Sequence, residues 1–407
     1  MSLSINRPLL SFESFKEKWS QVTMESLFPK IRNGFVGTAT PFYVNSGIAY
    51  LQGKNIQKGF INKKGLIFIS SEFHSKQKKS QLKYRDILMV QSGHVGECAV
   101  VNKEFQDSNC HALLVLTPLE DVNSQFYKNY FYTKYGRKKI HKITTGNTIK
   151  HILSSDLKKV EVPLPSLPEQ QKIADFLSTV DKKIQALNKK KELLESYQKG
   201  VMQQIFKQEI RFRKEDGSDY PKWEEKRLGE LGEFIGGGTP NTSIDEYWNG
   251  RIGWVSSSDI YNDNIHKVNI HKWVSEKGLS DSATKLIPKH SILIVSRVGL
   301  GKFAVNEQEI CTSQDFTNIT LTEGNPYFYA YMFLELKKIF LRFSQGTSIK
   351  GFTSKEIKLA KFTIPSIEEQ TKIANFLTAI DDKINVVVTQ IDKMKEWKKG
   401  LLQQMFV

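Results

Sequence analysis

The short motifs that carry chemistry in enzymes are absent from this sequence or incomplete. Residues 236–240, GGGTP, are glycine-rich but lack the lysine of a GxxxxGK[ST] phosphate loop, so they predict a tight turn. Residues 325–328, NPYF, approach the Asn/Asp-Pro-Pro-Tyr/Phe motif of amino methyltransferases, but the second proline and a glycine-rich cofactor loop are missing, which predicts a helix start instead. No nuclease-like set of carboxylates and lysine, and no Ser/His/Asp set with local context, is found. Together these absences favour a binding protein over an enzyme.

Metal and disulfide chemistry are not predicted either. Cys98, Cys110 and Cys311 form no CxxC pair and are too few for a disulfide framework, which predicts a reducing compartment and plain buried thiols. The eight histidines are scattered, and the spacing of five between His266 and His271 does not place both on one helical face. We therefore expect no metal site.

The charge of the chain indicates its class of partner. Lysine and arginine number 59 against 43 aspartate and glutamate, a net charge of +16, which suggests a polyanion and most commonly nucleic acid. The basic stretches 74–85 and 134–142 are candidates for phosphate contacts. The run 189–191 lies beside Glu192 and Glu195, so a merely solvated helix face is an equally good interpretation.

Two copies of one long segment organise the chain. Residues 163–206 return as 363–406 at a constant offset of 200. Ser166 with Glu169, and Ser366 with Glu369, predict capping boxes, in which each hydroxyl accepts from a first-turn amide and each carboxylate reaches back to the cap residue. Apolar residues at alternating steps of four and three then predict a coiled-coil seam rather than two separate amphipathic helices. The seam positions are Ile173, Leu177, Val180, Ile184, Leu187, Lys191, Leu194, Gln198, Val201 and Ile205, and Ile373, Leu377, Ile380, Ile384, Val387, Ile391, Met394, Lys398, Leu401 and Met405.

The connection between the copies predicts their direction. Each helix would be roughly 60 Å long, whereas a compact connecting segment, residues 207–362, is only about 35 Å across. The end of the first helix should therefore lie near the start of the second, which makes the pair antiparallel.

The repeat extends beyond the helices. Matching blocks recur at offsets of 200 to 205, separated by short insertions that predict loops. They pair 48–56 with 252–260, 86–101 with 291–306, and 144–165 with 344–365. Phe12 and Trp19 echo Phe212 and Trp223, which suggests a pseudo-cyclic arrangement in which the N-terminal segment packs near the far end of the coil.

The predicted fold class is α+β, with two globular domains and an intramolecular antiparallel coiled coil. Short β-branched or aromatic runs predict strands at 65–70, 86–90, 111–117, 291–295 and 316–322. Residues 124–140 and 326–343 predict helices whose aromatic stripes are core rather than base-stacking platforms. We place a first domain at 1–162, a helix at 163–206, a linker at 207–222, a second domain at 223–362 and a second helix at 363–407.

Length and hydropathy agree with that organisation. The 407 residues suggest two or three domains. No apolar run approaches 18 residues, and the first 15 residues lack the basic start and apolar core of a signal peptide, so we expect a cytoplasmic protein without membrane contact.

Three stretches resemble a known family. Residues 232–260, the SxxEQxKIAxFL opening at 166–177 and 366–377, and GTSIKGFTSKEI at 346–357 are similar to the specificity (S) subunit of type I restriction-modification systems. The resemblance covers nearly the whole chain, and the first domain departs most from the family's pattern, at 27–56.

The resemblance implies a division of labour. Each globular domain would be a target-recognition domain that reads one half of a bipartite, asymmetric site in double-stranded DNA, and the coil would set the spacer between the halves. The family's partners are two methyltransferase subunits, which use S-adenosylmethionine, and two translocating restriction subunits, which use ATP and magnesium. This subunit would hold no cofactor and catalyse nothing. The alternatives are an adenine methyltransferase in its own right and a non-DNA coiled-coil adaptor.

Polar loops found in both repeats supply the candidate DNA contacts. In the first domain they are Lys54, Asn55, Ser92, His94, Thr145, Asn147 and Lys150. In the second they are Ser257, Ser258, Asp259, Arg297, Thr347, Ser348 and Lys350. Arginine with guanine and asparagine with adenine are favoured direct contacts, so Arg297 and Asn55 are the leading candidates for base reading. The alternative is that such polar loop residues only cap turns.

The repeated helix ends are the candidate methyltransferase contacts. They are Gly200, Gln203, Gln204 and Phe206 in the first copy, and Gly400, Gln403, Gln404 and Phe406 in the second. Simple packing of each helix end on a globular domain is an equally good interpretation.

Overall fold

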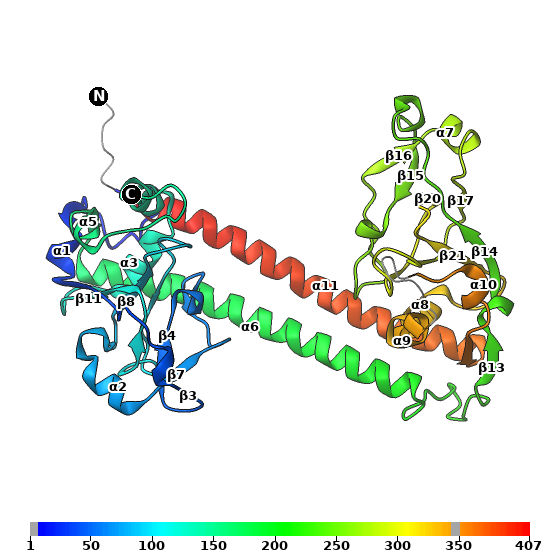
Figure 1. Ribbon diagram of the computed structural model, residues 1–407, viewed down its shortest axis with the longest axis horizontal. Helices are drawn as coiled ribbons and strands as arrows, with labels where there is room; N and C mark the ends of the chain where they lie inside the picture. Colours follow the sequence, from blue (N-terminus) through cyan, green and yellow to red (C-terminus); the bar gives the residue numbers. More distant parts are fainter. Residues whose placement is uncertain (1–6, 343–350) are drawn as a thin grey trace. The chain divides into compact units, whose positions relative to one another are not determined.

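A computed structural model describes residues 7–342 and 351–407 (Figure 1). The chain divides into two compact units. Unit 1 contains the chain up to Asn188 together with Thr389–Val407, and unit 2 is Lys189–Val388. Helix α6, Leu167–Phe206, begins in unit 1 and ends in unit 2, and helix α11, Ile367–Gln404, does the reverse.

Unit 1 contains two four-stranded sheets. The central sheet has the order β2-β11-β8-β9 and is antiparallel throughout. The outer sheet has the order β10-β4-β7-β3 and includes a parallel pair, β4 with β10. The strands are β2 (Lys30–Asn33), β3 (Tyr43–Val44), β4 (Ile48–Leu51), β7 (Ile67–Ile69), β8 (Ile87–Val90), β9 (Cys98–Val100), β10 (Asn109–Cys110) and β11 (Leu113–Thr117), with the small pairs β1 (Ser20–Thr23) with β12 (Glu161–Leu164) and β5 (Ile56–Gln57) with β6 (Phe60–Ile61).

Strand alternation makes the central sheet the middle of three layers. Because successive side chains point to opposite faces, Ile87 and Met89 of β8 enter one core with α3 and α6. Leu88 and Val90 enter a second core with the outer sheet. The helices of unit 1 are α1 (Met24–Leu27), α2 (Ser71–Lys76), α3 (Ser124–Phe131), α4 (Lys134–Lys142) and α5 (Ser154–Lys158), with short 3₁₀ turns η1 (Thr40–Phe42), η2 (Gly53–Asn55) and η3 (Lys78–Ser80).

Unit 2 repeats the central sheet and the parallel pair of the outer sheet, but the fourth strand of its outer sheet lies at the opposite edge. Its central sheet is β14-β21-β18-β19, its outer sheet is β16-β15-β20-β17 with β15 and β20 parallel, and β13 pairs with β22. The strands are β13 (Glu224–Arg227), β14 (Gly232–Gly236), β15 (Ile252–Val255), β16 (Lys272–Val274), β17 (Leu286–Ile287), β18 (Ile292–Ile294), β19 (Phe303–Val305), β20 (Ile310–Thr312), β21 (Thr317–Leu321) and β22 (Lys361–Ile364). The helices are α7 (Glu276–Ser280), α8 (Pro326–Glu335), α9 (Lys337–Arg342) and α10 (Ser354–Ile357), with η4 (Leu228–Glu230), η5 (Asp245–Tyr247) and η6 (Ser257–Asp259). The duplication and the α+β class predicted from the sequence are confirmed.

The predicted seam is turned inward along both long helices. None of its twenty positions is exposed, including the two lysines and the glutamine. In unit 1 the start of α6 packs against the end of α11 in the opposite direction, because Phe176 meets Trp397 while the later Ile184 shares a core with the earlier Met394. The antiparallel prediction is thereby confirmed.

Among the described residues, only one of the four hydrogen bonds that the two capping boxes predict is formed. Both helices begin directly after Ser166 and Ser366, and the Ser366 hydroxyl accepts from the Glu369 amide at 3.4 Å. The two carboxylates do not return to the cap residue, because each accepts from a tryptophan of its own unit instead. Glu169 accepts from Trp19, and Glu369 from Trp223.

The next residue of each copy holds the start of an earlier helix of the same unit. Gln170 donates to the Pro165 carbonyl and accepts from the Asn123 amide, and Gln370 does the same with Pro365 and Asn325. Asn123 and Asn325 are the N-caps of α3 and α8. The NPYF stretch is therefore a helix start, as predicted.

The N-terminal segment packs as the pseudo-cyclic hypothesis predicts. The Leu10 amide donates to the Gln404 carbonyl at 2.9 Å, as Ile210 does to Gln204 at 3.4 Å. Phe12 then contacts Phe176 edge-on. Phe212 contacts Phe376 in the same way in unit 2.

The aromatic stripes and the cysteines are core. The first predicted helix is two helices, α3 and α4, because Thr133 caps a new start, and the second is likewise divided into α8 and α9. The buried rings include Phe126, Tyr127, Tyr130, Phe131, Phe328, Tyr329, Tyr331 and Phe333. All three cysteines are free and buried, and burial raises the pKa of Cys98 and Cys110 to about 12. Within residues 7–342 and 351–407 no helix has the length and apolar character needed to span a membrane.

Candidate nucleic-acid interface

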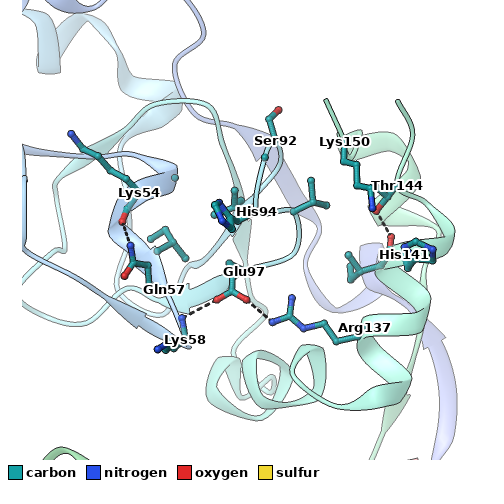
Figure 2. A pocket seen from close by; sticks show the side chains of 16 residues that line it. Lys54, Gln57, Lys58, Ser92, His94, Glu97, Arg137, His141, Thr144 and Lys150 are labelled. Carbon is teal, nitrogen blue, oxygen red and sulfur yellow. Dashed lines mark hydrogen bonds and ion pairs between the residues drawn. The ribbon is translucent and has the colours of Figure 1, made fainter. Parts of the chain in front are cut away.

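Unit 1 contains a cleft of about 920 Å³ whose walls carry many cationic groups (Figure 2). Four of the residues predicted as DNA contacts line it: Lys54, Ser92, His94 and Lys150. The sequence separates these residues by nearly 100 positions, and the fold brings them to one place. The other lining residues are Gly53, Ile56, Gln57, Lys58, Val90, Gly93, Val95, Glu97, Arg137, Ile140, His141 and Thr144.

Three chain segments form the cleft. The turn η2 follows the outer-sheet strand β4, and residues 92–96 form the loop between β8 and β9. The third segment is 144–151, which is tied to that loop: the Gly93 amide donates to the Lys150 carbonyl at 3.4 Å, and Ser92 Oγ lies 2.6 Å from His151 Nδ1. Thr145 is held by paired backbone hydrogen bonds with His151, so it lies beside the cleft without lining it. Asn147 is exposed in the same segment and does not line the cleft.

One carboxylate lies among these cations and is already paired. Glu97 Oε1 accepts from Arg137 at 2.6 Å, and its Oε2 accepts from the Lys58 amide and the Tyr132 hydroxyl. Burial alone would raise the pKa of Glu97, but these hydrogen bonds outweigh it and hold the pKa below its usual value. The charge of Glu97 thus organises one wall of the cleft.

The side chain of Asn55 is not available to a base. It is fully buried, its Oδ1 accepts from the Gln52 amide at 3.0 Å, and its Nδ2 donates to the Asn62 carbonyl at 3.0 Å. Asp259 has the same place in η6, where it accepts from the Ser256 amide at 2.7 Å. In this structure both residues cap the turn after a strand, so the turn-capping interpretation applies to them, and the leading position given to Asn55 is corrected.

The second unit presents the corresponding loops. Arg297 follows β18, is exposed, and lies beside Gly351, whose neighbour Phe352 donates to the Ser296 carbonyl at 3.0 Å. Ser258 is exposed and its hydroxyl lies 2.8 Å from that of Ser256. Ser257 is half-buried, and its carbonyl accepts from Lys302. Thr347, Ser348 and Lys350 lie outside the described residues.

Two cationic residues and one histidine of the cleft were not singled out from the sequence. Arg137 and His141 belong to the basic stretch 134–142, which forms α4. Only the packing of α4 against the loop before β9, where Ile140 lies next to Gly96, brings them to the cleft. Lys58 has positive φ in the turn between β5 and β6. The other basic stretch, 74–85, forms the end of α2 and the turn η3 and does not line the cleft.

The repeated helix ends divide into buried and open positions. Phe406 is 1% exposed and contacts Trp19, Phe126 and Tyr130 of unit 1. Phe206 is buried against Phe328 in unit 2. Gln403 accepts from the Lys134 amide at 3.1 Å. Packing on the globular part therefore accounts for the two phenylalanines.

The remaining positions of the helix ends are more open. Gln203 is half-buried, whereas Gln204 and Gln404 are exposed. A Cβ added at Gly200 or Gly400 would meet no described atom within 4 Å other than its own helix backbone. Gln204, Gln404 and the two glycines are therefore the more accessible positions of the helix ends.

Comparison with known proteins agrees with this architecture. The model of the type I restriction modification DNA specificity domain matches twice, at residues 16–196 and 220–396. The chain belongs to this family. Each match takes in one globular part and most of the long helix that follows it, which is the repeat found in the sequence.

Individual relatives support the assignment. The chain is 32% identical over 210 residues to the type I restriction enzyme MjaIX specificity subunit of Methanocaldococcus jannaschii, covering 50% of this chain and 48% of that protein. It is 25% identical over 406 residues to the putative MjaX specificity subunit of the same organism, covering 95% and 92%. The chain thus spans about half the length of the first relative and most of the second. Because these relatives are specificity subunits, they favour a recognition subunit over a methyltransferase or a non-DNA adaptor.

Solved structures share the fold. The S subunit of a type I restriction-modification system from M. genitalium superposes with a TM-score of 0.63 at 18% identity, covering 98% of this chain and 99% of that one. A chain from a study of complex assembly and conformational transition of the type I R-M system gives a TM-score of 0.57 at 16% identity, covering 94% and 96%.

Proposed function

We propose that this chain is the DNA-specificity subunit of a type I restriction-modification complex, in which the globular part of each unit reads one half of a bipartite site. The observation that carries the proposal is the cationic cleft of unit 1, which is formed by loops that recur in unit 2. Family membership supplies the class of function, and the cleft supplies a place for it.

The charge of the cleft suits a phosphate backbone. No ion pair between described residues involves Lys54, Lys58 or Lys150, so these three ammonium groups are available to neutralise phosphates. Ser92 and His94 are exposed on the loop between two core strands, where a rigid sheet can hold them against base edges. Arg297 occupies the matching loop of unit 2, where its planar guanidinium suits guanine O6 and N7.

The two long helices connect the two readers. A continuous helix has a fixed rise per residue, so the lengths of α6 and α11 would set the number of unread base pairs between the half-sites. The buried seam supports this proposal, because it makes the helices a paired element rather than a loose linker.

Methyltransferase subunits would dock on the outer faces of the helices. Tyr197 and Trp397, at matching positions of α6 and α11, are 53% and 48% exposed. Each is followed by an open glycine and an exposed glutamine, at 200 and 204 or at 400 and 404. Exposed tyrosine and tryptophan side chains are common at surfaces that another chain covers. Those partners would supply S-adenosylmethionine, and restriction subunits would supply ATP and magnesium chemistry in the cytoplasm.

Selection from a random duplex library tests this function. The purified chain in complex with its methyltransferase partner should enrich a bipartite sequence with two defined halves and an undefined spacer. A variant with Lys54, Lys58 and Lys150 changed to glutamine should retain less duplex DNA overall. The duplexes that it does retain should still contain the half-site read by unit 2. Enrichment of a single continuous site, or of no site, would contradict the proposal.

A further inference from the structure

The start of α6 borders an acidic pocket of about 380 Å³ in unit 1. Three carboxylate residues line it, Glu17, Asp121 and Glu169, against one lysine, Lys18. In a chain with a net charge of +16, such a pocket suits a cation and not the DNA backbone. Its other walls are Trp19, Ser20, Leu164, Pro165, Ser166, Leu167 and Gln170.

Unit 2 contains the same arrangement with a cation already in it. Both carboxylate oxygens of Glu369 accept from Arg211, at 3.2 Å and 2.6 Å, and Arg211 also donates to the Pro221 carbonyl at 2.7 Å. By the repeat, Glu369 corresponds to Glu169 and Pro221 corresponds to Glu17, and both counterparts line the pocket of unit 1. The pocket therefore lies where unit 2 holds a guanidinium.

Unit 1 does not supply that arginine from the equivalent position. The Leu10 and Ile210 amides donate to equivalent carbonyls of the two helix ends, which aligns Ser11 with Arg211. Arg7, the nearby cation of the same chain, donates to the Ser11 hydroxyl at 3.4 Å and makes no ion pair with Glu169.

Within the described part of the chain, Glu169 is therefore a buried carboxylate without an arginine partner, and only one of its two oxygens accepts a hydrogen bond. Glu169 is 4% exposed, and its Oε2 accepts from the Trp19 indole at 3.0 Å. Its Oε1 has no hydrogen-bond partner among the described residues, and Glu169 is one of the residues that line the pocket. Burial raises the pKa of Glu169, as expected for a carboxylate that lacks a full complement of donors.

We propose that this pocket receives an arginine side chain of the methyltransferase subunit that docks on unit 1. The inference rests on the proposed function for the identity of the partner. The location of the pocket supports a methyltransferase subunit as the partner. The Leu10 amide, in the segment before the pocket residues 17–20, donates to the Gln404 carbonyl. Gln404 ends the exposed helix face that also carries Trp397 and Gly400. A bidentate pair with Glu169 would reproduce in trans the contact that Arg211 makes in cis.

Complex formation with the methyltransferase subunit gives the first test. E169Q keeps an acceptor for Trp19 but removes the charge, and we expect it to weaken the complex by about tenfold or more. S11R should place a guanidinium in the pocket and weaken the complex similarly. E13Q, which removes an exposed carboxylate from the same segment, is the matched control and should bind like the wild type. Wild-type affinity for both E169Q and S11R would overturn the proposal, and a loss in R7Q equal to that in E169Q would make Arg7 the occupant instead.

A direct probe separates this inference from the proposed function. N-acetyl-arginine methylamide should shift the indole ¹⁵N–H resonance of Trp19 in the isolated full chain, and E169Q should abolish the shift. If the wild type fails to bind any methyltransferase but the probe result holds, the proposed function fails and the pocket stands. No shift in the wild type, or an equal shift in E169Q, rejects the pocket.

Discussion

Trp19 donates its indole N–H to Glu169 at 3.0 Å, and Trp223 makes the same bond to Glu369 at 3.2 Å in the second unit. These bonds join each globular part to the first turn of the helix that follows it. The two carboxylates differ in their charge partners, since only Glu369 pairs with an arginine at hydrogen-bond distance.

This difference predicts unequal costs for the same substitution. E369Q should lower the free energy of unfolding of unit 2 by about 1 to 3 kcal/mol, because Arg211 loses a charge-assisted pair on a fully buried carboxylate. E169Q should cost unit 1 less, since it keeps the Trp19 bond and breaks no arginine pair. Urea midpoints of the two variants check this, and equal midpoints would show that Arg211 contributes nothing.

A buried cluster at the start of α6 contains more positive than negative charge. Lys398 lies 2.5 Å from Asp181 Oδ1, and Lys128 lies 3.8 Å from Oδ2. K398M should destabilise unit 1 by about 3 kcal/mol, because it removes the close partner of a buried carboxylate. K128M should be neutral or stabilising. A larger loss for K128M than for K398M would contradict this interpretation.

The same cluster predicts a pH dependence. Burial lowers the pKa of Lys128 below its usual value. Between the folded and unfolded pKa values the unfolded chain binds more protons, so the Lys128 contribution to stability rises as pH rises toward about 10.4. The difference in urea midpoint between K128M and wild type should therefore shrink from pH 8 to pH 10. A constant difference would argue against a depressed pKa.

Asn55 should affect stability rather than base choice. N55A should cost about 1 to 2 kcal/mol, because it leaves the Gln52 amide and the turn without their cap. N55D should also destabilise the turn, because aspartate keeps the acceptor for the Gln52 amide but cannot donate to the Asn62 carbonyl, and it buries a charge. DNA-selection profiles of both variants should match the wild type, and a changed base preference in unit 1's half-site would restore Asn55 as a reader.

Arg297 should affect one half-site only. R297A should reduce discrimination at that half by about 1 to 3 kcal/mol, as expected for the loss of a bidentate guanine contact. K289A, an exposed cation of the same unit, is the control. Uniform weakening on all sequences would make Arg297 a phosphate contact.

Much of this arrangement could be predicted because it is periodic or repeated. The 4-3 spacing predicted the buried seam, and β-branched runs such as 86–90 and 291–295 predicted the central strands. The parallel pair of β4 with β10 was missed, since β10 has only two residues and carries no periodic signal. The cap at Asn55 had a signal, namely the repeated i, i+3 pairing of Gln52 with Asn55 and Ser256 with Asp259. Arg137 could be flagged only as part of a basic stretch, because its pairing with Glu97 depends on tertiary packing.

The spacer proposal has its own test. Deleting residues 186–192 and 386–392 together removes one heptad, about 10 Å of rise, from both helices. Because base pairs stack about 3.4 Å apart, the unread spacer should shorten by roughly three while both half-sites stay the same. An unchanged spacer would show that the helices do not set it.

Mapping methylated adenines in a host that carries this chain with its methyltransferase partner tests the proposed recognition role itself. We predict one bipartite, asymmetric motif with a methylated adenine in each half, and loss of that motif when this chain is removed. Methylation at a continuous motif, or a pattern unchanged without this chain, would contradict that role.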